Sequence, residues 1–340
     1  PPVAAFGGSR MEPFSILIQN LLSPLVLAFA LGMIARLVKS ELEFPEGVLK
    51  FISVYLLFAI GLKGGMELST VTWNEVAGAL AVTVVLILAI PFICFEVLRR
   101  LGRFDVPNAA AIAAHYGSVS SVTFFAALSF ANAMNTPAEG FMPAVVALME
   151  WGVIVALLIA RYHMGKQAAA ETGTTYSIGE LFLDSLRGRG ILLLTGGMTI
   201  GFVTGETGYA QVAPFYDEIF RGILMLFLLE MGMAAARQMR EFAKVGPFML
   251  GFGVIMPMVF GAAGVALGHL AGLSVGGAFV FGAIAASASY IDAPAACRAA
   301  LPTANPSIYL TSSLAITFPF NLILGLPLYY ELSKRLAVWM

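Results

Sequence analysis

The stretch HYGSVSSVT at residues 115–123 interrupts a long apolar run and decides the fold. The stretch SASYIDAP at residues 287–294 interrupts a second apolar run in the same way. Both stretches combine small and hydroxyl residues with glycine or proline. This composition suits a membrane helix that is broken partway, because its unwound backbone needs polar partners. We therefore expect two discontinuous transmembrane helices whose breaks face each other.

The composition indicates a membrane protein. Of the 340 residues, 59% are hydrophobic and 11% are charged, whereas soluble domains carry about 25% charged residues. The net charge of -1 argues against a nucleic-acid partner. Long, continuous apolar runs favour helices over a barrel. We predict an all-α polytopic protein with about ten transmembrane helices, at roughly 14–38, 48–68, 75–98, 107–131, 141–163, 190–205, 215–237, 245–270, 274–299 and 306–333.

A polar segment at residues 164–189 divides these runs into two groups of five, residues 14–163 and 190–340. Because five is odd, the groups cross the membrane in opposite directions, as in transporters built from inverted repeats. We predict two inverted five-helix repeats joined by a cytoplasmic linker that is helical around residues 178–186. Residues 1–13 are expected to be a disordered tail or a cloning remnant.

Recurring residues support the repeat. The tetrapeptide AIAA at residues 111–114 returns at residues 283–286, a shift of 172, and Gly61 matches Gly232 at a shift of 171. The two serine-rich stretches are then equivalent, so the predicted crossed, discontinuous helices are spans four and nine. Cys94 and Cys297 lie in apolar runs and predict two buried free thiols.

Cationic residues predict the orientation, because positively charged loops tend to stay in the cytoplasm. With both termini outside, fourteen of the nineteen lysines and arginines fall on the inner side. We therefore expect a bacterial inner-membrane protein with both termini in the periplasm. The five cations on the outer side are Arg10, Lys63, Arg221, Lys334 and Arg335.

The broken helices predict ion sites. A half-helix N-terminus presents free N–H groups that suit a small oxyanion, and a half-helix C-terminus presents carbonyls that suit sodium when a carboxylate is near. The hypothetical sodium site comprises Ser118, Ser120, Thr123 and Asp292. The hypothetical anion site comprises Ser118, Val119, Ser121, Ser287 and Ser289, with Gly64 and Gly65 allowing close approach of the substrate. The alternative is that these hydroxyls and glycines only pack helices together.

Other polar residues inside spans are candidates for a supporting role: His115, Glu150, Glu230 and Asn321. An acid within a membrane span is by default functional, although an ion pair with Lys63 or Arg221 would equally explain either glutamate. His115 is expected to be a hydrogen-bonded interior histidine rather than a proton relay. The sequence has no metal or nucleotide motif, and no cofactor is expected beyond sodium as the coupling ion.

Several stretches resemble the sodium-dependent bicarbonate transporters of cyanobacterial type: GLKGGM at 61–66, AHYGSVS at 114–120, residues 142–150, LLEMGM at 228–233 and SYIDAPAA at 289–296, with its continuation to Pro327. The resemblance implies sodium-driven bicarbonate symport by an elevator-like mechanism, in which a core domain of spans 3–5 and 8–10 moves against a gate domain of spans 1, 2, 6 and 7. It also implies a homotrimer and a PII-like cytoplasmic regulator. The chain shows no recognisable motif for binding that regulator.

Three alternatives remain from the sequence. The same architecture could carry another small anion, such as an organic acid. A cation/proton exchanger would be expected to place two adjacent acids at the crossing, where only Asp292 occurs. A membrane-embedded enzyme is the weakest reading, because His115 and Asp292 alone do not form a catalytic set.

Overall fold

The computed structural model describes residues 18, 21–171, 189–239, 242–290 and 293–339. Every regular element in this part of the chain is a helix, which confirms the all-α prediction. The predicted tail at residues 1–13, most of the predicted linker and its helical part at residues 178–186 lie outside the described residues.

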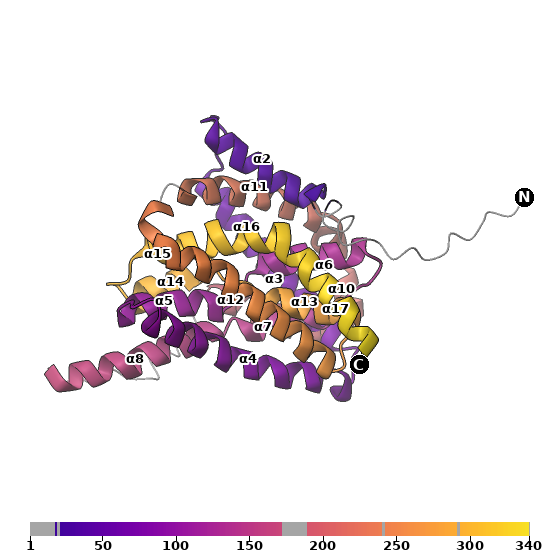
Figure 1. Ribbon diagram of the computed structural model, residues 1–340. Coiled ribbons are helices and arrows are strands. Elements are labelled where there is room, and N and C mark those ends of the chain that lie inside the picture. The colour runs from indigo at the N-terminus through magenta and orange to yellow at the C-terminus, as the bar shows by residue number, and fades with distance from the viewer. Residues whose placement is uncertain (1–17, 19–20, 172–188, 240–241, 291–292, 340) are drawn as a thin grey trace, which may run out of the picture.

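The elements follow one another in two groups (Figure 1). The first group is α2 (Pro24–Leu37), α3 (Glu46–Leu68), α4 (Trp73–Arg100), α5 (Val106–Gly117), α6 (Ser121–Ala133), α7 (Met142–Met149) and α8 (Gly152–Glu171). The second is α10 (Arg189–Ala210), η1 (Pro214–Glu218), α11 (Phe220–Met239), α12 (Phe242–Leu270), α13 (Val275–Ala285), α14 (Ala293–Ala300), α15 (Pro306–Leu310), η2 (Thr311–Thr317), α16 (Phe318–Phe320), η3 (Asn321–Gly325) and α17 (Leu326–Trp339).

Seven helical stretches in the described residues are long and apolar enough to cross a membrane, and the shorter apolar helices α2 and α13 accompany them. The chain is thus a multi-pass membrane protein by length and composition, and the count of ten spans stays a prediction. The seven are Glu46–Leu68, Trp73–Arg100, Val106–Ala133, Met142–Met164, Pro214–Gln238, Gly246–Leu270 and Pro306–Trp339.

Two of the predicted runs differ from the observed helices. The first run was expected at residues 14–38. Ile18 and Leu21 are helical, the chain turns at Leu22 and Ser23, and α2 begins at Pro24, where Ser23 Oγ accepts a hydrogen bond from the Val26 N–H at 3.3 Å. A serine cap followed by proline is a strong helix start. The fifth run was expected to end at residue 163 and to be continuous. It is interrupted at Glu150 and Trp151, and its second part, α8, continues to Glu171.

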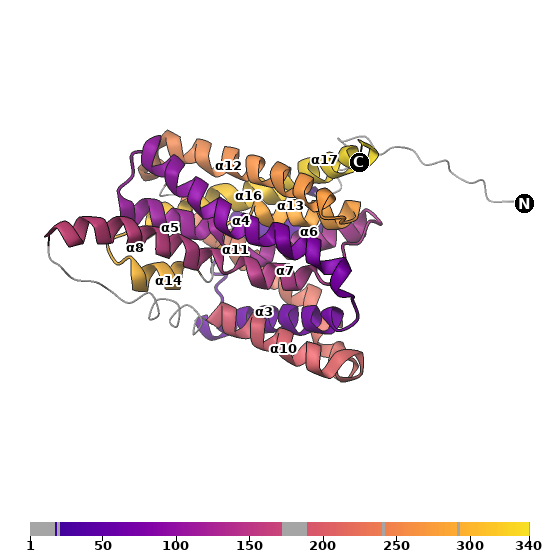
Figure 2. The same ribbon diagram turned by 90° about the horizontal axis from the view of Figure 1, so that it is seen from below.

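The helices pack in pairs across the two groups. Helix α2 lies along α11, and α3 lies along α10. Figure 1 shows the first pair at one edge of the molecule, and Figure 2 shows the second pair beside the remaining helices. Glycines allow the close approach: a Cβ on Gly32 would lie 1.9 Å from the Leu229 carbonyl oxygen, and one on Gly232 would lie 2.0 Å from that of Phe29. Small residues of this kind drive helix packing in membranes.

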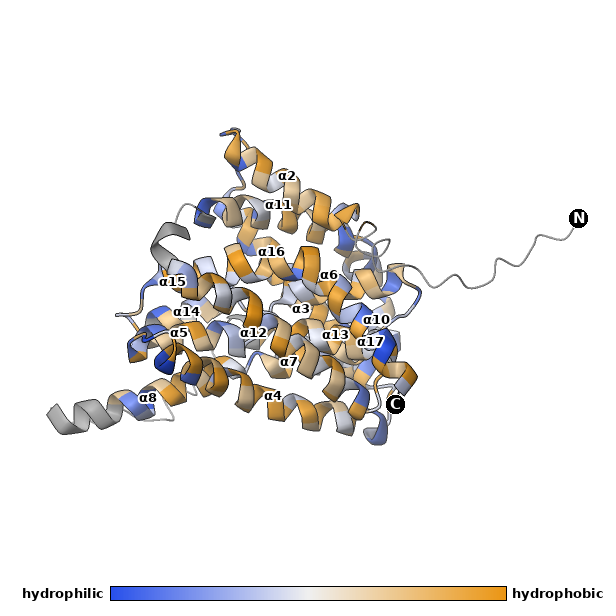
Figure 3. Ribbon diagram, viewed as in Figure 1, coloured by the Kyte–Doolittle hydropathy of each residue, from blue (hydrophilic) through white to orange (hydrophobic). Residues whose placement is uncertain are grey.

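The remaining helices pack mainly against one another. Helix α5 packs between α4 and α8, and α13 packs against α12 and α17. Apolar residues cover the outward faces of α2, α4 and α12 (Figure 3), as expected for surfaces that meet lipid. Cys94 and Cys297 are both buried and free, which confirms that prediction.

Candidate functional site

The first predicted break is present between α5 and α6. Helix α5 ends at Gly117, and Ser118 and Ser120 are extended, with φ/ψ of -97°/166° and -93°/109°. Ser120 caps the next half-helix, because its Oγ accepts a hydrogen bond from the Thr123 N–H at 3.2 Å. The serine therefore both ends the extended segment and starts α6.

The second break lies between α13 and α14. Helix α13 ends at Ala285, and helix resumes at Ala293. The Ser287 hydroxyl donates to the Ile284 carbonyl at 2.7 Å and so satisfies the end of α13. At the start of α14, the Ala293 N–H donates to Ser289 Oγ at 3.4 Å. Asp292, predicted as a sodium ligand, lies outside the described residues.

The two breaks contact each other directly, as predicted. The Ser120 N–H donates to Ser287 Oγ at 2.8 Å. The Ser289 N–H donates to the His115 carbonyl at 2.7 Å. Ser118, Ser120, Ser287 and Ser289 are all buried, each exposing 3% or less of its surface. The four half-helix ends are therefore enclosed within protein, where their polar groups need internal partners.

The half-helix ends leave backbone groups available. Within the described residues, the N–H groups of Ser121 and Val122 at the start of α6 donate no hydrogen bond, and the carbonyls of Tyr116 and Gly117 at the end of α5 accept none. The two N–H groups suit an anion, and the two carbonyls suit a cation. The buried Thr123 hydroxyl also has no partner among the described residues, although it lies in the first turn of α6.

Glu150 joins the first break from another helix. It lies between α7 and α8, exposes 2% of its surface, and accepts a hydrogen bond from Ser118 Oγ at 2.5 Å. The sequence marked this acid as a supporting residue, with Lys63 or Arg221 as an alternative partner, and did not predict its contact with Ser118. The interruption of its helix was also missed, since the run around it is uniformly apolar.

Asn321 contacts the backbone at the second break. Its Nδ2 donates to the Ala286 carbonyl at 2.8 Å, at the end of α13, and its Oδ1 accepts from the Tyr329 hydroxyl at 3.0 Å. Glu150 and Asn321 are separated by 171 residues, the same shift that relates Gly61 to Gly232. The predicted repeat would make these two positions equivalent. Glu150 contacts the first break with a carboxylate, and Asn321 contacts the second with an amide.

His115 is an interior, hydrogen-bonded histidine, as expected. Its Nδ1 lies 2.7 Å from the Ala111 carbonyl and must carry the proton, because a carbonyl only accepts. Its ring stacks on Tyr309 with centroids 4.4 Å apart. The Nε2 atom is buried and has no hydrogen-bond partner among the described residues.

Gly64 and Gly65 lie at helix contacts. A Cβ on Gly64 would lie 2.6 Å from Cβ of Pro143, and one on Gly65 would lie 1.9 Å from the Met198 carbonyl. The packing alternative from the sequence therefore accounts for both glycines. Their contact with substrate stays a prediction.

The expected ion pairs have different partners. Glu230 is buried and pairs with Arg237, seven residues later on the same helix. Lys63 pairs with Asp217 at 2.7 Å. The prediction that Lys63 or Arg221 neutralises Glu230 is therefore wrong, although a structural ion pair at Glu230 is confirmed.

A hydroxyl cluster beside the first break was missed by the sequence reasoning. The Tyr116 hydroxyl lies 2.6 Å from Ser312 Oγ and 2.6 Å from Thr317 Oγ1, and Thr317 donates to the Gly253 carbonyl at 2.7 Å. The cluster links α5 to the π-helical segment η2 and to α12. Such segments often mark functional sites in membrane and soluble helices. The density of serine and threonine at residues 311–317 was the available signal.

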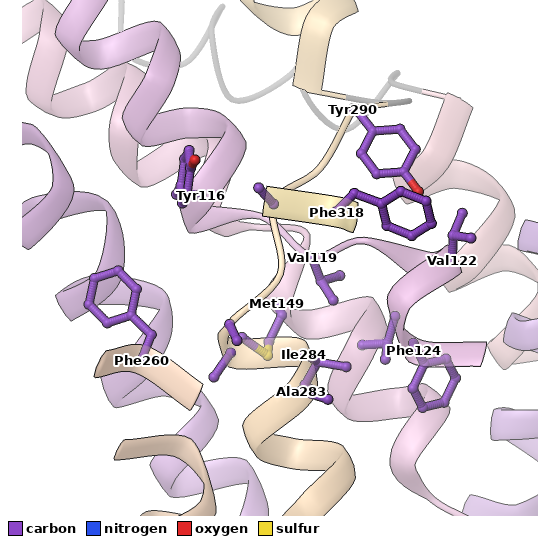
Figure 4. Close-up of a cluster of buried hydrophobic side chains, with 14 of the residues drawn as sticks. Tyr116, Val119, Val122, Phe124, Met149, Phe260, Ala283, Ile284, Tyr290 and Phe318 are labelled. Atoms are coloured by element: carbon purple, nitrogen blue, oxygen red, sulfur yellow. The ribbon is translucent and has the colours of Figure 1, made fainter. Parts of the chain in front are cut away.

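Apolar side chains enclose the polar breaks. Val119, predicted near the anion, is 1% exposed and lies among Val122, Ile284 and Phe318 (Figure 4). Tyr290 packs against Phe318, with ring centroids 5.3 Å apart. The surroundings are thus apolar with a few convergent polar groups, a combination that is typical of binding sites.

Comparison with known proteins identifies one family. The family model described as the Na+-dependent bicarbonate transporter superfamily matches residues 24–334. The match spans both breaks and all four half-helix ends. No curated protein matches the chain.

Proposed function

The chain belongs to the Na+-dependent bicarbonate transporter superfamily, and we propose that it carries bicarbonate into the cytoplasm together with sodium. The observation that carries the proposal is the direct contact between two interrupted helices, with Ser120 bonded to Ser287 and Ser289 bonded to His115. Two breaks that meet in the interior supply both positive and negative backbone ends at one place. An anion and its coupling cation can therefore bind side by side.

The proposed bicarbonate site lies at the start of α6. The free N–H groups of Ser121 and Val122 carry the partial positive charge of the helix end. The hydroxyls of Ser121 and Ser289 add donors, with Ser118 and Ser287 at the edge, since their hydroxyls already donate to Glu150 and to the Ile284 carbonyl. Val119 forms an apolar wall that limits the anion to a compact one.

The proposed sodium site lies at the end of α5. The carbonyls of Tyr116 and Gly117 provide oxygen ligands, and the buried Glu150 carboxylate is bonded to the adjacent Ser118 hydroxyl. The Thr123 hydroxyl is available to complete the shell. Ser120 and Asp292 were predicted as further ligands and remain part of the proposal. Sodium bound here would offset the negative charge of bicarbonate, which couples the two ions.

We also propose that the fold is an inverted repeat that works as an elevator. Under a shift of about 172, the first and second spans become the sixth and seventh, so the pair α2 and α11 is equivalent to the pair α10 and α3. These four helices form the proposed gate, and the broken helices with α4, α8, α12 and α17 form the proposed core. Movement of the core against the gate would expose the breaks alternately to each side.

Four further expectations belong to the proposal: a homotrimer, an inner-membrane location, periplasmic termini and a PII-like cytoplasmic regulator. They rest on the resemblance and on the distribution of lysine and arginine.

The test is uptake of labelled inorganic carbon into proteoliposomes that contain the purified full chain, with an inward sodium gradient or with potassium in its place. We expect uptake only with sodium. Absence of carbon uptake, combined with sodium-driven uptake of a small carboxylate such as acetate, would favour the second candidate, a symporter of another small anion. Sodium flux that follows pH without any anion would indicate exchange.

A further inference from the structure

A cavity of about 480 Å³ separates α6 from the pair formed by α2 and α11. Its floor is apolar and buried, formed by Val26, Ala126, Phe130 and Leu322. Asn132 and Arg221 lie at its exposed rim. The volume is within the roughly 300–1,000 Å³ of ligand-binding sites in proteins.

Arg221 is the one ionisable side chain among the described residues that line this cavity. In the described part of the chain it forms no ion pair, and nearby Asp217 is held by Lys63 at 2.7 Å. Arg237, on the same helix as Arg221, is paired with Glu230. A guanidinium that has no ion pair within the described residues, placed at the rim of an apolar cavity, is complementary to an anion with a long apolar body. A guanidinium also suits phosphate, which it can bind with two parallel hydrogen bonds.

The surface around the rim is apolar and exposed. Leu22 and Leu27 on the α2 side are 65% and 49% exposed, and Met225 on α11 is 42% exposed. A lipid chain can therefore reach the cavity sideways from the membrane. A hydrophilic ion such as bicarbonate would find few polar partners on the apolar floor.

We propose that this cavity binds an anionic phospholipid, with its phosphate on Arg221 and one acyl chain between α2 and α6. The site would have a mechanical consequence. Helix α6 begins at the first break, and Leu322 directly follows Asn321, which holds the second break. The opposite wall belongs to α2 and α11. A chain in the cavity would therefore lie between the ion-binding helices and the paired helices, and would bias their relative position.

The experiment measures retained lipid. The full chain is reconstituted in nanodiscs of phosphatidylcholine with phosphatidylglycerol, and lipids that remain bound after transfer to detergent are counted by native mass spectrometry. Arg221→Gln removes the charge. Gly222→Leu narrows the cavity at low strain, because an added Cβ at Gly222 meets nothing within 4 Å. Arg335→Gln is the control, since this exposed arginine bonds Glu331 on α17 and does not line the cavity.

We expect the native chain to retain phosphatidylglycerol in preference to phosphatidylcholine. Arg221→Gln should lower that retention about fivefold, the effect of one cation near an anionic lipid. Gly222→Leu should lower retention of both lipids, and Arg335→Gln should change neither. If Gly222→Leu does not fold, the retention of phosphatidylglycerol by Arg221→Gln alone tests the proposal.

Four results would overturn the proposal. The first is equal retention of the two lipids by the native chain, and the second is unchanged retention in Arg221→Gln. The third is displacement of phosphatidylglycerol by added oleate at equal concentration, which would assign the cavity to a free fatty acid. The fourth is loss of an oligomer in Gly222→Leu, with no lipid bound to the native chain, which would instead place a second copy of the chain there.

Discussion

The backbone N–H of Ser289 donates to the carbonyl of His115 at 2.7 Å, so the second break closes directly on the last turn of α5. Both groups are buried, and both belong to the main chain. Only proline at position 289 would remove the donor of this bond, because proline has no backbone N–H. This contact of the crossing therefore depends on the backbone, whereas the contact between Ser120 and Ser287 depends on a side chain.

Ser287→Ala tests the second contact between the breaks. The change removes the acceptor of the Ser120 N–H and leaves that donor buried and unpaired. Such a loss costs about 1–3 kcal/mol. We expect the bicarbonate concentration for half-maximal uptake to rise about tenfold, measured as sodium-driven uptake in proteoliposomes.

Ser313→Ala is the matched control for this substitution. Ser313 is equally buried, but its hydroxyl donates to the Tyr309 carbonyl one turn earlier rather than across a break. We expect near-native uptake. Equal losses in the two variants would show that any buried serine matters and would contradict a special role for Ser287.

Glu150→Gln tests the charge at the first break. Glutamine keeps the size of the side chain and an oxygen that accepts from Ser118, but it removes the negative charge. Hydrogen bonds and contacts to a charged group exceed neutral ones by about 1–2 kcal/mol. We expect the sodium concentration for half-maximal uptake to rise about tenfold, with a smaller change in the bicarbonate dependence.

Glu96→Gln is the control, because Glu96 is a partly exposed acid on α4 that pairs with Arg100 on its own helix. It should leave the sodium dependence unchanged. An unaltered sodium dependence in Glu150→Gln would remove Glu150 from the proposed cation site and leave the carbonyls and hydroxyls to bind sodium with Asp292.

Gly65→Ala separates helix packing from substrate contact. A Cβ here would lie 1.9 Å from the Met198 carbonyl on α10, so the two helices must move apart, at a cost of about 1–3 kcal/mol. We expect a lower unfolding temperature in detergent. Gly47→Ala in the same helix meets nothing within 4 Å and should be neutral or stabilising by up to about 1 kcal/mol. Native stability of Gly65→Ala with lost uptake would instead favour the substrate role.

Local composition was sufficient to predict the two breaks. Clusters such as residues 115–123 contrast with the Leu, Val and Phe of ordinary spans, and an unwound membrane helix requires that contrast. Helix boundaries were less accurate, because the turn at Leu22 and Ser23 that precedes α2 lies inside the first apolar run. A run of apolar residues predicts a segment in contact with lipid or the protein core. It does not by itself predict the residue at which the helix begins.

The partners of the buried polar residues could not be predicted, because they depend on how separate spans pack. Glu150 was recognised as an acid in a span, but its contact with Ser118 joins residues 32 positions apart. For Glu230 the mirrored position of Lys63 suggested a partner. Its actual partner, Arg237, lies two turns away on the same helix, a distance that a long arginine side chain can cover.

Asn321→Ala tests the residue that holds the end of α13. The substitution leaves the Ala286 carbonyl buried without its donor, at a cost of about 1–3 kcal/mol, whereas Tyr329→Phe removes one bond of about 1 kcal/mol and keeps the Asn321 donor in place. We therefore expect Asn321→Ala to lower both uptake and unfolding temperature more than Tyr329→Phe does. If the two variants lose equal uptake, the tyrosine contact rather than the bond to Ala286 positions the second break.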